Sequence, residues 1–202
     1  MPFKKLIQPL QEKLAEKGFD EPLDFQKKVL SKIKGGANMY AIAPRGAGKT
    51  TSLVLSVLQK LNNEPFQEAP RALIFVQDKD AAQDLEMQFK EFKHRELRVY
   101  SVYEEKDFND QRDDIYDGVD VVIATPKRLT KIFLSNGINL NRLRMMIVDD
   151  AEFLIGNIGL SQVSRIPESL SKCQYIIFAE NYNNRFNQWN ETFMFNAQLI
   201  KT

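Results

Sequence analysis

The sequence predicts a three-layer α/β domain with a mostly parallel central sheet, and three observations support this. Short apolar runs alternate along the chain with longer amphipathic segments. Most of these runs are continuous, which is typical of parallel strands buried on both faces. A glycine-rich segment, residues 43–50, and an acidic segment, residues 149–152, each come at the end of such a run. Alternation of strand and helix favours a sheet covered on both faces and joined by right-handed crossovers.

The expected strands are the runs rich in β-branched and aromatic residues. The first reads MYAIA and leads into the glycine-rich segment, and the fifth, MMIV, leads into the acidic one. Both are too short to be helices and are bounded by turn or charged residues. In chain order the expected strands are 39–43, 72–77, 98–103, 119–124, 145–149 and 175–179.

Amphipathic segments fill the intervals and are expected to be helices. The one that follows the glycine-rich segment begins at Lys49, and two further helices precede the first strand. Residues 62–70 read only as a polar surface loop. The expected helices are 6–17, 24–33, 49–61, 80–92, 108–116, 127–134, 162–170 and 185–193.

Composition limits the class of protein. At 202 residues and 43% hydrophobic content, the chain is long enough for one domain over 1–202, with the N-terminal helices in 1–37 and the core in 38–202. A net charge of +1 argues against a strongly basic nucleic-acid surface but does not exclude a local patch.

The single cysteine, Cys173, cannot form an internal disulfide and is expected in the core, which suits a reducing cytoplasm. No apolar stretch approaches the roughly 20 residues of a membrane span, so we expect no membrane partner.

The glycine-rich segment is typical of a phosphate-binding loop. It places Arg45, Gly46, Ala47 and Gly48 between an expected strand and a helix that starts at Lys49 and Thr50. Glycines let the backbone wrap closely around phosphate, and the helix N-terminus attracts the anion. Lys49 is expected to reach the β- and γ-phosphates, and the Thr50 hydroxyl to coordinate Mg²⁺.

Asp149 is the expected second ligand of the metal. It ends a buried strand, and the carboxyl ends of parallel strands meet at one edge of the sheet, where ligands bind. The glycine loop and Asp149 are therefore expected to converge on one site. The pattern predicts a nucleoside triphosphate as ligand, with Mg²⁺ as cofactor.

The two segments together resemble the first RecA-like domain of DEAD-box RNA helicases, and the resemblance runs along almost the whole chain. Position 43 is Ala, as in that family, where general phosphate loops have Gly. The segment 18–26 resembles the adenine-reading segment of the family, which implies that Gln26 reads the adenine edge and that Phe19 stacks beside the base. Leu23 stands where the family usually has Thr, so one hydroxyl contact is missing. The resemblance implies ATP or ADP as the nucleotide.

A second segment, 125–128, resembles the Thr-Pro-Gly-Arg segment through which the family contacts RNA. It implies that Thr125, Lys127 and Arg128 meet the phosphate backbone of single-stranded RNA. Lys127 replaces a Gly of the family pattern. Lys79 is the one cation retained from the family's Pro-Thr-Arg-Glu-Leu segment, which corresponds to residues 77–81 here.

Departures from the family are concentrated where chemistry and RNA contact take place. Asp150 replaces the Glu that orients the attacking water, and its side chain is about 1.5 Å shorter. Misplacement of that order costs about a hundredfold in rate. Asp150 is therefore a weak catalytic candidate beside Lys49. Glu152 replaces the last Asp, and the Ser-Ala-Thr segment it normally contacts is replaced by residues 179–181. Both hydroxyls are lost, and Glu180 is expected to lie near Glu152. Sequence drift and redesign both explain this.

The RNA side shows opposing charge. Glu104 and Glu105 take the place of a Gly-Gly pair, and Asp78 adds a third carboxylate, so RNA binding is expected to be weak. The family's second RecA-like domain, which supplies an arginine finger, is not found in these 202 residues, and Arg45 is too close to Lys49 in sequence to be assumed a finger. We expect little or no ATP turnover unless a second domain or another protein acts in trans.

Three hypotheses remain open. The chain is the ATPase half of a helicase, a degenerate nucleotide-sensing or protein-interaction module without turnover, or a structural domain that has lost nucleotide. The third is disfavoured by the intact Gly46, Gly48, Lys49, Thr50 and Asp149. His94 and Trp189 have no partners at metal-ligand or triad spacing, so core or surface roles are expected for both.

Overall fold

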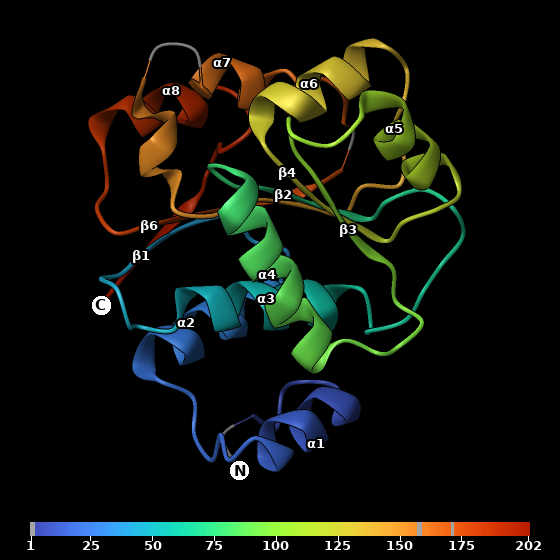
Figure 1. Ribbon diagram of the computed structural model, residues 1–202. Coiled ribbons are helices and arrows are strands. Elements are labelled where there is room, and N and C mark those ends of the chain that lie inside the picture. Colours follow the sequence, from blue (N-terminus) through green and yellow to red (C-terminus); the bar gives the residue numbers. More distant parts are fainter. Residues whose placement is uncertain (1–2, 157–158, 171) are drawn as a thin grey trace.

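The computed structural model describes residues 3–156, 159–170 and 172–202, which form a seven-stranded sheet between two layers of helices (Figure 1). All neighbouring strands are parallel, in the order β3-β4-β2-β5-β6-β1-β7. The predicted α/β fold with a parallel sheet is confirmed. The strands are β1 Met39–Ile42, β2 Ala72–Phe75, β3 Val99–Val102, β4 Val121–Ala124, β5 Met145–Val148, β6 Gln174–Ala179 and β7 Gln198–Lys201.

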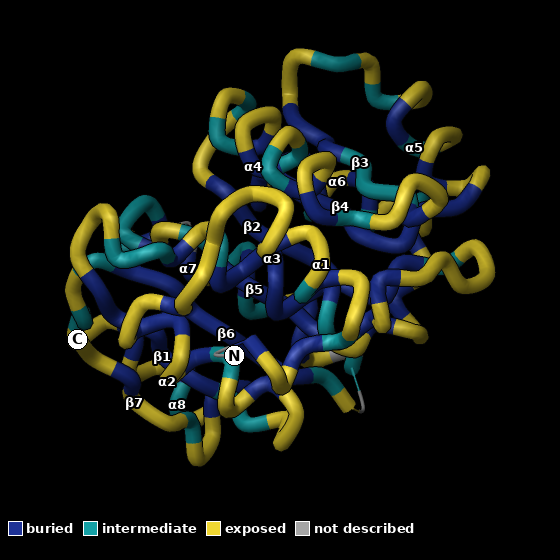
Figure 2. The backbone as a smooth tube through the Cα atoms, turned by 90° about the horizontal axis from the view of Figure 1, so that it is seen from below, coloured by how far each residue is buried: buried dark blue, intermediate teal, exposed yellow. Residues whose placement is uncertain are grey.

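The apolar runs are continuous because the sheet is buried on both faces. In β1, Met39 and Ala41 join one core cluster, while Tyr40 and Ile42 join the cluster on the opposite face. The other central strands alternate in the same way, as the two-residue period of a strand requires. Figure 2 shows the resulting buried interior along the strands, with exposed residues on outer helix turns and loops.

Helices cover the faces in chain order. The first four pack on one face and contact one another through α2, α3 and α4, and the later four cover the other face (Figure 1). The first group comprises α1 Gln8–Glu16, α2 Asp24–Ile33, α3 Lys49–Lys60 and α4 Lys79–Phe92. The second comprises α5 Phe108–Tyr116, α6 Pro126–Leu134, α7 Gly159–Ser164 and α8 Asn187–Asn190. Short 3-10 segments lie at Ala151–Ile155, Pro167–Ser169 and Asn184–Phe186.

Two expected helices near the C-terminus are wrong in detail, and one strand there was not predicted. The helix expected over 162–170 ends at Ser164, and Pro167, which has no N–H to donate, begins a 3-10 turn instead. The helix expected over 185–193 is reduced to α8, in a segment rich in Asn, which favours turns over helix interiors. Strand β7 is not predicted by the apolar pattern, because only Ile200 of its four residues is buried.

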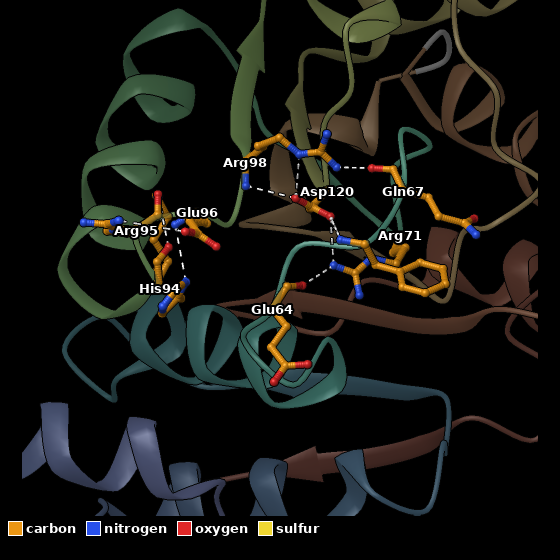
Figure 3. Close-up of polar contacts among 10 residues, drawn as sticks. Glu64, Gln67, Arg71, His94, Arg95, Glu96, Arg98 and Asp120 are labelled. Carbon is orange, nitrogen blue, oxygen red and sulfur yellow. Dashed lines mark hydrogen bonds and ion pairs between the residues drawn. The ribbon is translucent and has the colours of Figure 1, made fainter.

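A buried charge network fixes the amino ends of three adjacent strands (Figure 3). Asp120, Arg71 and Arg98 each immediately precede a strand: β4, β2 and β3 respectively. Asp120 is fully buried and accepts hydrogen bonds from Arg71 Nη2 at 2.9 Å, from Arg98 Nε at 3.0 Å and from the backbone N–H groups of Arg98 and Phe66. These donors outweigh the effect of burial, which by itself raises the pKa, and hold the pKa of Asp120 below its ordinary value. The network therefore links three strands at the edge opposite their carboxyl ends.

Two residues singled out in the sequence have core roles. Trp189 is fully buried, stacks on Phe186 with ring centroids 5.3 Å apart, and donates its indole N–H to Ser164 Oγ at 3.1 Å. Cys173 is half-buried, and burial raises the pKa of its thiol to about 12, so it is not a reactive thiolate. Within the described parts of the chain, no helix is both long and apolar enough to cross a membrane.

Candidate nucleotide site

The phosphate-binding loop lies at the carboxyl edge of the sheet, as the sequence predicts. It follows β1, while Asp149 follows β5, and β6 lies between these two strands. A hydrogen bond from the Ala43 N–H to the Ala179 carbonyl, at 3.1 Å, ties the start of the loop to the end of β6. Three strand ends thus bring the loop beside two segments that lie more than a hundred residues further along the chain.

The loop conformation depends on its glycines. Gly46 and Gly48 have φ values of 81° and 82°, in the left-handed region that side chains disfavour. At Gly48 a Cβ atom would also lie 2.5 Å from Nε2 of Gln26, which is too close for two heavy atoms. Gly48 is the residue that precedes α3, so it sets both the turn into the helix and the contact with α2.

Lys49 connects the loop to the acidic segment. Its side chain is only 8% exposed, and its Nζ donates to the Ala43 carbonyl at 3.0 Å. The same Nζ lies 3.5 Å from Asp150 Oδ1. A buried ammonium at a helix N-terminus, beside a backbone that curves through two left-handed glycines, provides positive charge where phosphate would bind. Thr50 is exposed at the first turn of the same helix.

Asp149 has an unpaired oxygen. Within the described residues, its Oδ1 is buried and has no hydrogen-bond donor. The pKa of Asp149 is raised to about 7, mainly by burial and secondly by the negative charge of Asp150. The positive charge of Lys49 lowers this pKa and offsets part of the rise. A buried carboxylate oxygen without a donor is the kind of group that a cation satisfies, and Mg²⁺ prefers hard oxygen ligands such as this carboxylate and the Thr50 hydroxyl. The residues present therefore fit a magnesium ion.

The described residues contain no group of three or more His, Cys, Asp or Glu side chains arranged to hold a metal. Mg²⁺ bound with nucleotide needs only one or two carboxylates, because phosphate oxygens and water supply the remaining positions.

Asp150, the weak catalytic candidate, has an unusual backbone. Its φ of 45° and ψ of 59° are left-handed, and its side chain is 64% exposed. Asp residues tolerate this conformation better than most. In this arrangement the carboxylate is directed to Lys49, so it neutralises the cation of the loop.

Glu152 retains a contact with the segment after β6, although the hydroxyls of that segment are lost. Its Oε1 accepts the backbone N–H of Glu180 at 2.6 Å and that of Asn181 at 3.0 Å. The carboxylate of Glu180, expected from the sequence to face Glu152, instead binds Arg45 Nε at 2.6 Å. The segment is therefore held by main-chain groups, and the two carboxylates do not oppose each other.

Gln26 and Phe19 differ in their relation to the loop. Gln26 is buried; its Oε1 accepts the Leu23 N–H at 2.9 Å, and its Nε2 lies against Gly48. Phe19 is 44% exposed and packs on Phe92, the last residue of α4, with centroids 6.3 Å apart. Because α4 starts at the carboxyl edge and runs for about 20 Å, this placement argues against stacking of Phe19 on the base.

The residues expected to bind RNA lie at two neighbouring strand ends. Lys79 begins α4 after β2, and 125–128 follow β4. Lys127 is exposed and Lys79 half-buried, but Thr125 and Arg128 are buried. The Thr125 hydroxyl donates to Glu104 Oε2 at 2.7 Å, and Arg128 donates to the carbonyls of Glu104 and Lys106. Two of the four candidates therefore hold the 104–106 loop, a role that sequence reasoning missed.

A large cavity lies away from the phosphate-binding loop. It has a volume of about 1310 Å³ and is lined by residues 67–70, by the end of α5 and by residues within 135–142. These segments precede β2, β4 and β5, so the cavity is at the amino edge of the sheet. It contains none of the residues of the phosphate-binding loop.

Comparisons with known proteins place the chain in a family. A model described as DEAD/DEAH box helicase matches residues 23–184. The chain is 29% identical over 168 residues to "ATP-dependent RNA helicase ddx54" of Dictyostelium discoideum, which covers 83% of this chain and 15% of that protein. It is 24% identical over 194 residues to "DEAD-box ATP-dependent RNA helicase 20" of Arabidopsis thaliana, covering 94% of this chain and 39% of that protein. The chain thus spans well under half the length of these relatives.

A solved structure shares the fold. The crystal structure of a DEAD box protein from the hyperthermophile Methanococcus jannaschii superposes with a TM-score of 0.88 at 20% sequence identity, covering 97% of this chain and 54% of that one. At this identity the likeness supports the RecA-like architecture alone.

Proposed function

Because the chain belongs to the DEAD/DEAH box helicase family, we propose that it binds ATP or ADP with Mg²⁺ at the 45–50 loop. The observation that carries this proposal is the pairing of a buried lysine with a buried, unpartnered carboxylate oxygen. Lys49 and Asp149 come from different strand ends, and Asp150 joins their segments through its 3.5 Å contact with Lys49. A triphosphate–magnesium complex satisfies both groups at once, because it supplies anions to Lys49 and a cation to Asp149.

Each residue has a defined part in this proposal. Gly46, Ala47 and Gly48 form the backbone that wraps around phosphate, and Lys49 supplies charge. Thr50 and Asp149 hold the metal, which when bound would neutralise charge on the phosphates. Gln26 selects adenine, since its Nε2 lies at the loop and its amide is fixed by the Leu23 N–H.

We further propose that the chain by itself hydrolyses ATP very slowly. The carboxylate of Asp150 is directed to Lys49, and it is one methylene shorter than the Glu that the resemblance places there. An arginine finger is worth about 10³–10⁵ in rate, and Arg45, the arginine of the loop itself, is bound to Glu180. Turnover then depends on a second RecA-like domain or another protein acting in trans.

A nucleotide-sensing module without turnover is the second candidate function. The same Lys49–Asp150 contact favours it, because a carboxylate that neutralises the loop cation is not placed to orient water. Hydrolysis measured together with a supplied second RecA-like domain separates the two, since only the helicase half gains activity.

We propose single-stranded RNA as a weak ligand of the surface formed by Lys79 and residues 125–128. Lys79 and Lys127 are the accessible cations. The Glu104 carboxylate accepts a hydrogen bond from the Thr125 hydroxyl, and the Glu104 carbonyl accepts one from Arg128. Few phosphate contacts give weak binding that falls steeply with salt.

Calorimetric titration with ATP, ADP and GTP, with and without Mg²⁺, tests the proposal. We expect ATP and ADP to bind, to bind more tightly with Mg²⁺, and to bind more tightly than GTP. Lys49→Ala removes a charged hydrogen-bond donor and should lower affinity by about 10- to 100-fold or more. Lys32→Ala, at an exposed position of α2, is the matched control. Because Lys49 is buried, thermal melts of both variants must show a folded protein; unchanged affinity in folded Lys49→Ala overturns the assignment.

A further inference from the structure

Two ion pairs surround the phosphate-binding loop. Arg45 Nε lies 2.6 Å from Glu180 Oε1, and Lys49 Nζ lies 3.5 Å from Asp150 Oδ1. Each cation comes from the loop, and each carboxylate comes from the segment after a strand, β6 or β5. The protein thus neutralises the loop with its own carboxylates at the place where phosphates are proposed to bind.

The Arg45–Glu180 pair is the more easily exchanged of the two. The Arg45 side chain is 90% exposed and that of Glu180 is 31% exposed, whereas Lys49 is buried. Exposed ion pairs contribute little free energy, so a stronger anion can displace Glu180 without a large loss. A phosphate group is such an anion, because it carries more charge and matches the fork of donors of a guanidinium.

Glu180 also lies within the electrostatic influence of Lys49. The hydrogen bond and charge of Arg45, followed by the charge of Lys49, hold the pKa of Glu180 below its ordinary value. An anion bound at Lys49 therefore acts on the Glu180 carboxylate by repulsion, in addition to competing for Arg45.

The segment that contains Glu180 is tied to the acidic segment by main-chain bonds. Glu152 Oε1 accepts the N–H groups of Glu180 and Asn181, and Glu152 lies three residues after Asp149. Contacts therefore run from Arg45 to Glu180, through its backbone to Glu152, and on to the segment proposed to hold the metal.

We propose that Arg45 senses the terminal phosphate, exchanging Glu180 for the γ-phosphate when ATP is bound and remaining on Glu180 when ADP is bound. This inference rests on the proposed nucleotide binding. It assigns to Arg45 the discrimination between ATP and ADP, and to Glu180 the role of an internal competitor. Release of Glu180 frees the side chain of a segment that Glu152 continues to hold by its backbone.

Dissociation constants for ATP and ADP, measured in Mg²⁺ for the wild type and four variants, test the exchange. Glu180→Gln removes the competing charge and should tighten ATP by about two- to fivefold, with ADP unchanged or tightened by less. Arg45→Ala should weaken ATP by about tenfold and ADP by less than about twofold. The double variant should match Arg45→Ala, because Glu180 acts on ATP chiefly through Arg45. Glu191→Gln, an exposed carboxylate on the C-terminal segment, is the control and should change neither constant.

The same experiment separates this inference from the proposed function. If the wild type binds neither nucleotide, both are overturned. If it binds both and neither variant moves the ratio of ATP to ADP affinity, or Glu180→Gln weakens ATP, only the role of Arg45 is overturned. Both side chains have exposed surface, so the variants should fold, and thermal melts check this.

A direct readout without turnover is the NMR signal of the Arg45 side-chain Nε–H. We expect it to shift on adding a non-hydrolysable ATP analogue with Mg²⁺ and to stay near its nucleotide-free position with ADP. Equal shifts with the two ligands contradict the exchange. Arg45→Lys, which keeps the charge but lacks the donor fork, should retain only part of the preference for ATP.

Discussion

Replacing Asp120 with asparagine tests whether the buried charge network fixes the amino edge of the sheet. Asp120 is fully buried and accepts four hydrogen bonds, two from the guanidinium groups of Arg71 and Arg98 and two from backbone N–H groups. The substitution keeps the shape of the side chain, removes the negative charge, and turns one acceptor oxygen into a donor. Arg71, itself only 4% exposed, would then be buried without a counter-charge.

The expected loss is large because one partner of a buried pair is removed. Such changes cost about 3–5 kcal/mol of unfolding free energy, a substantial part of the 5–15 kcal/mol typical of a domain. For a chain of this length the melting temperature should fall by about 6 to 20 °C. Asp113→Asn is the matched control: its side chain is 70% exposed, pairs with a half-exposed Arg112, and should cost less than about 0.5 kcal/mol.

The loss should depend on pH in a defined direction. The pKa of Asp120 is lower in the folded chain than in the unfolded chain, so its charge stabilises the fold fully above about pH 4 and loses this effect as pH falls through the folded value. The difference in unfolding free energy between the wild type and Asp120→Asn should therefore be constant near neutral pH and become smaller at acid pH.

Urea unfolding at pH 7 and at a series of lower pH values, with thermal melts, measures both quantities. A loss below about 1 kcal/mol at pH 7, or one that persists unchanged in acid, would refute the argument. Nucleotide affinity should be unaffected in the folded variant, because Asp120 lies at the sheet edge opposite the phosphate-binding loop.

Three further predictions concern the ligand surfaces. Single-stranded RNA should bind weakly at low salt, and binding should be lost near physiological salt. The double variant Glu104→Ala, Glu105→Ala should tighten RNA binding by about three- to tenfold, whereas the control Glu12→Ala, Glu16→Ala should not. Submicromolar binding by the wild type at physiological salt would contradict this prediction. The purified chain should hydrolyse ATP negligibly, and Asp150→Glu should raise the rate by less than about tenfold without a second domain. RNA-stimulated hydrolysis that is abolished by Asp149→Ala would restore the enzyme hypothesis. Gln26→Ala should reduce the preference for ATP over GTP, while Gln8→Ala, on the exposed face of α1, should leave it unchanged, and equal binding of both nucleotides by the wild type would remove adenine selection altogether.

Features that depend on neighbouring residues can be predicted from the amino-acid sequence alone. Most of the strands from β1 to β6 were predictable because they are continuous apolar runs, which a strand buried on both faces requires. The phosphate-binding loop was predictable because its glycines and Lys49 are consecutive and lie between a strand and a helix. The convergence of this loop with Asp149 followed from the rule that parallel strands share a carboxyl edge.

Features that depend on pairs distant in sequence were decided by the tertiary structure. The Arg45–Glu180 pair spans 135 positions, and Arg71, Arg98 and Asp120 look in the sequence like ordinary charged residues before strands. Thr125 and Arg128 read as ligands of RNA, but the fold turns them onto the 104–106 loop. Strand order and loop packing determine which charges meet, and the free energy of a charge depends on its partner and its burial; local sequence specifies neither.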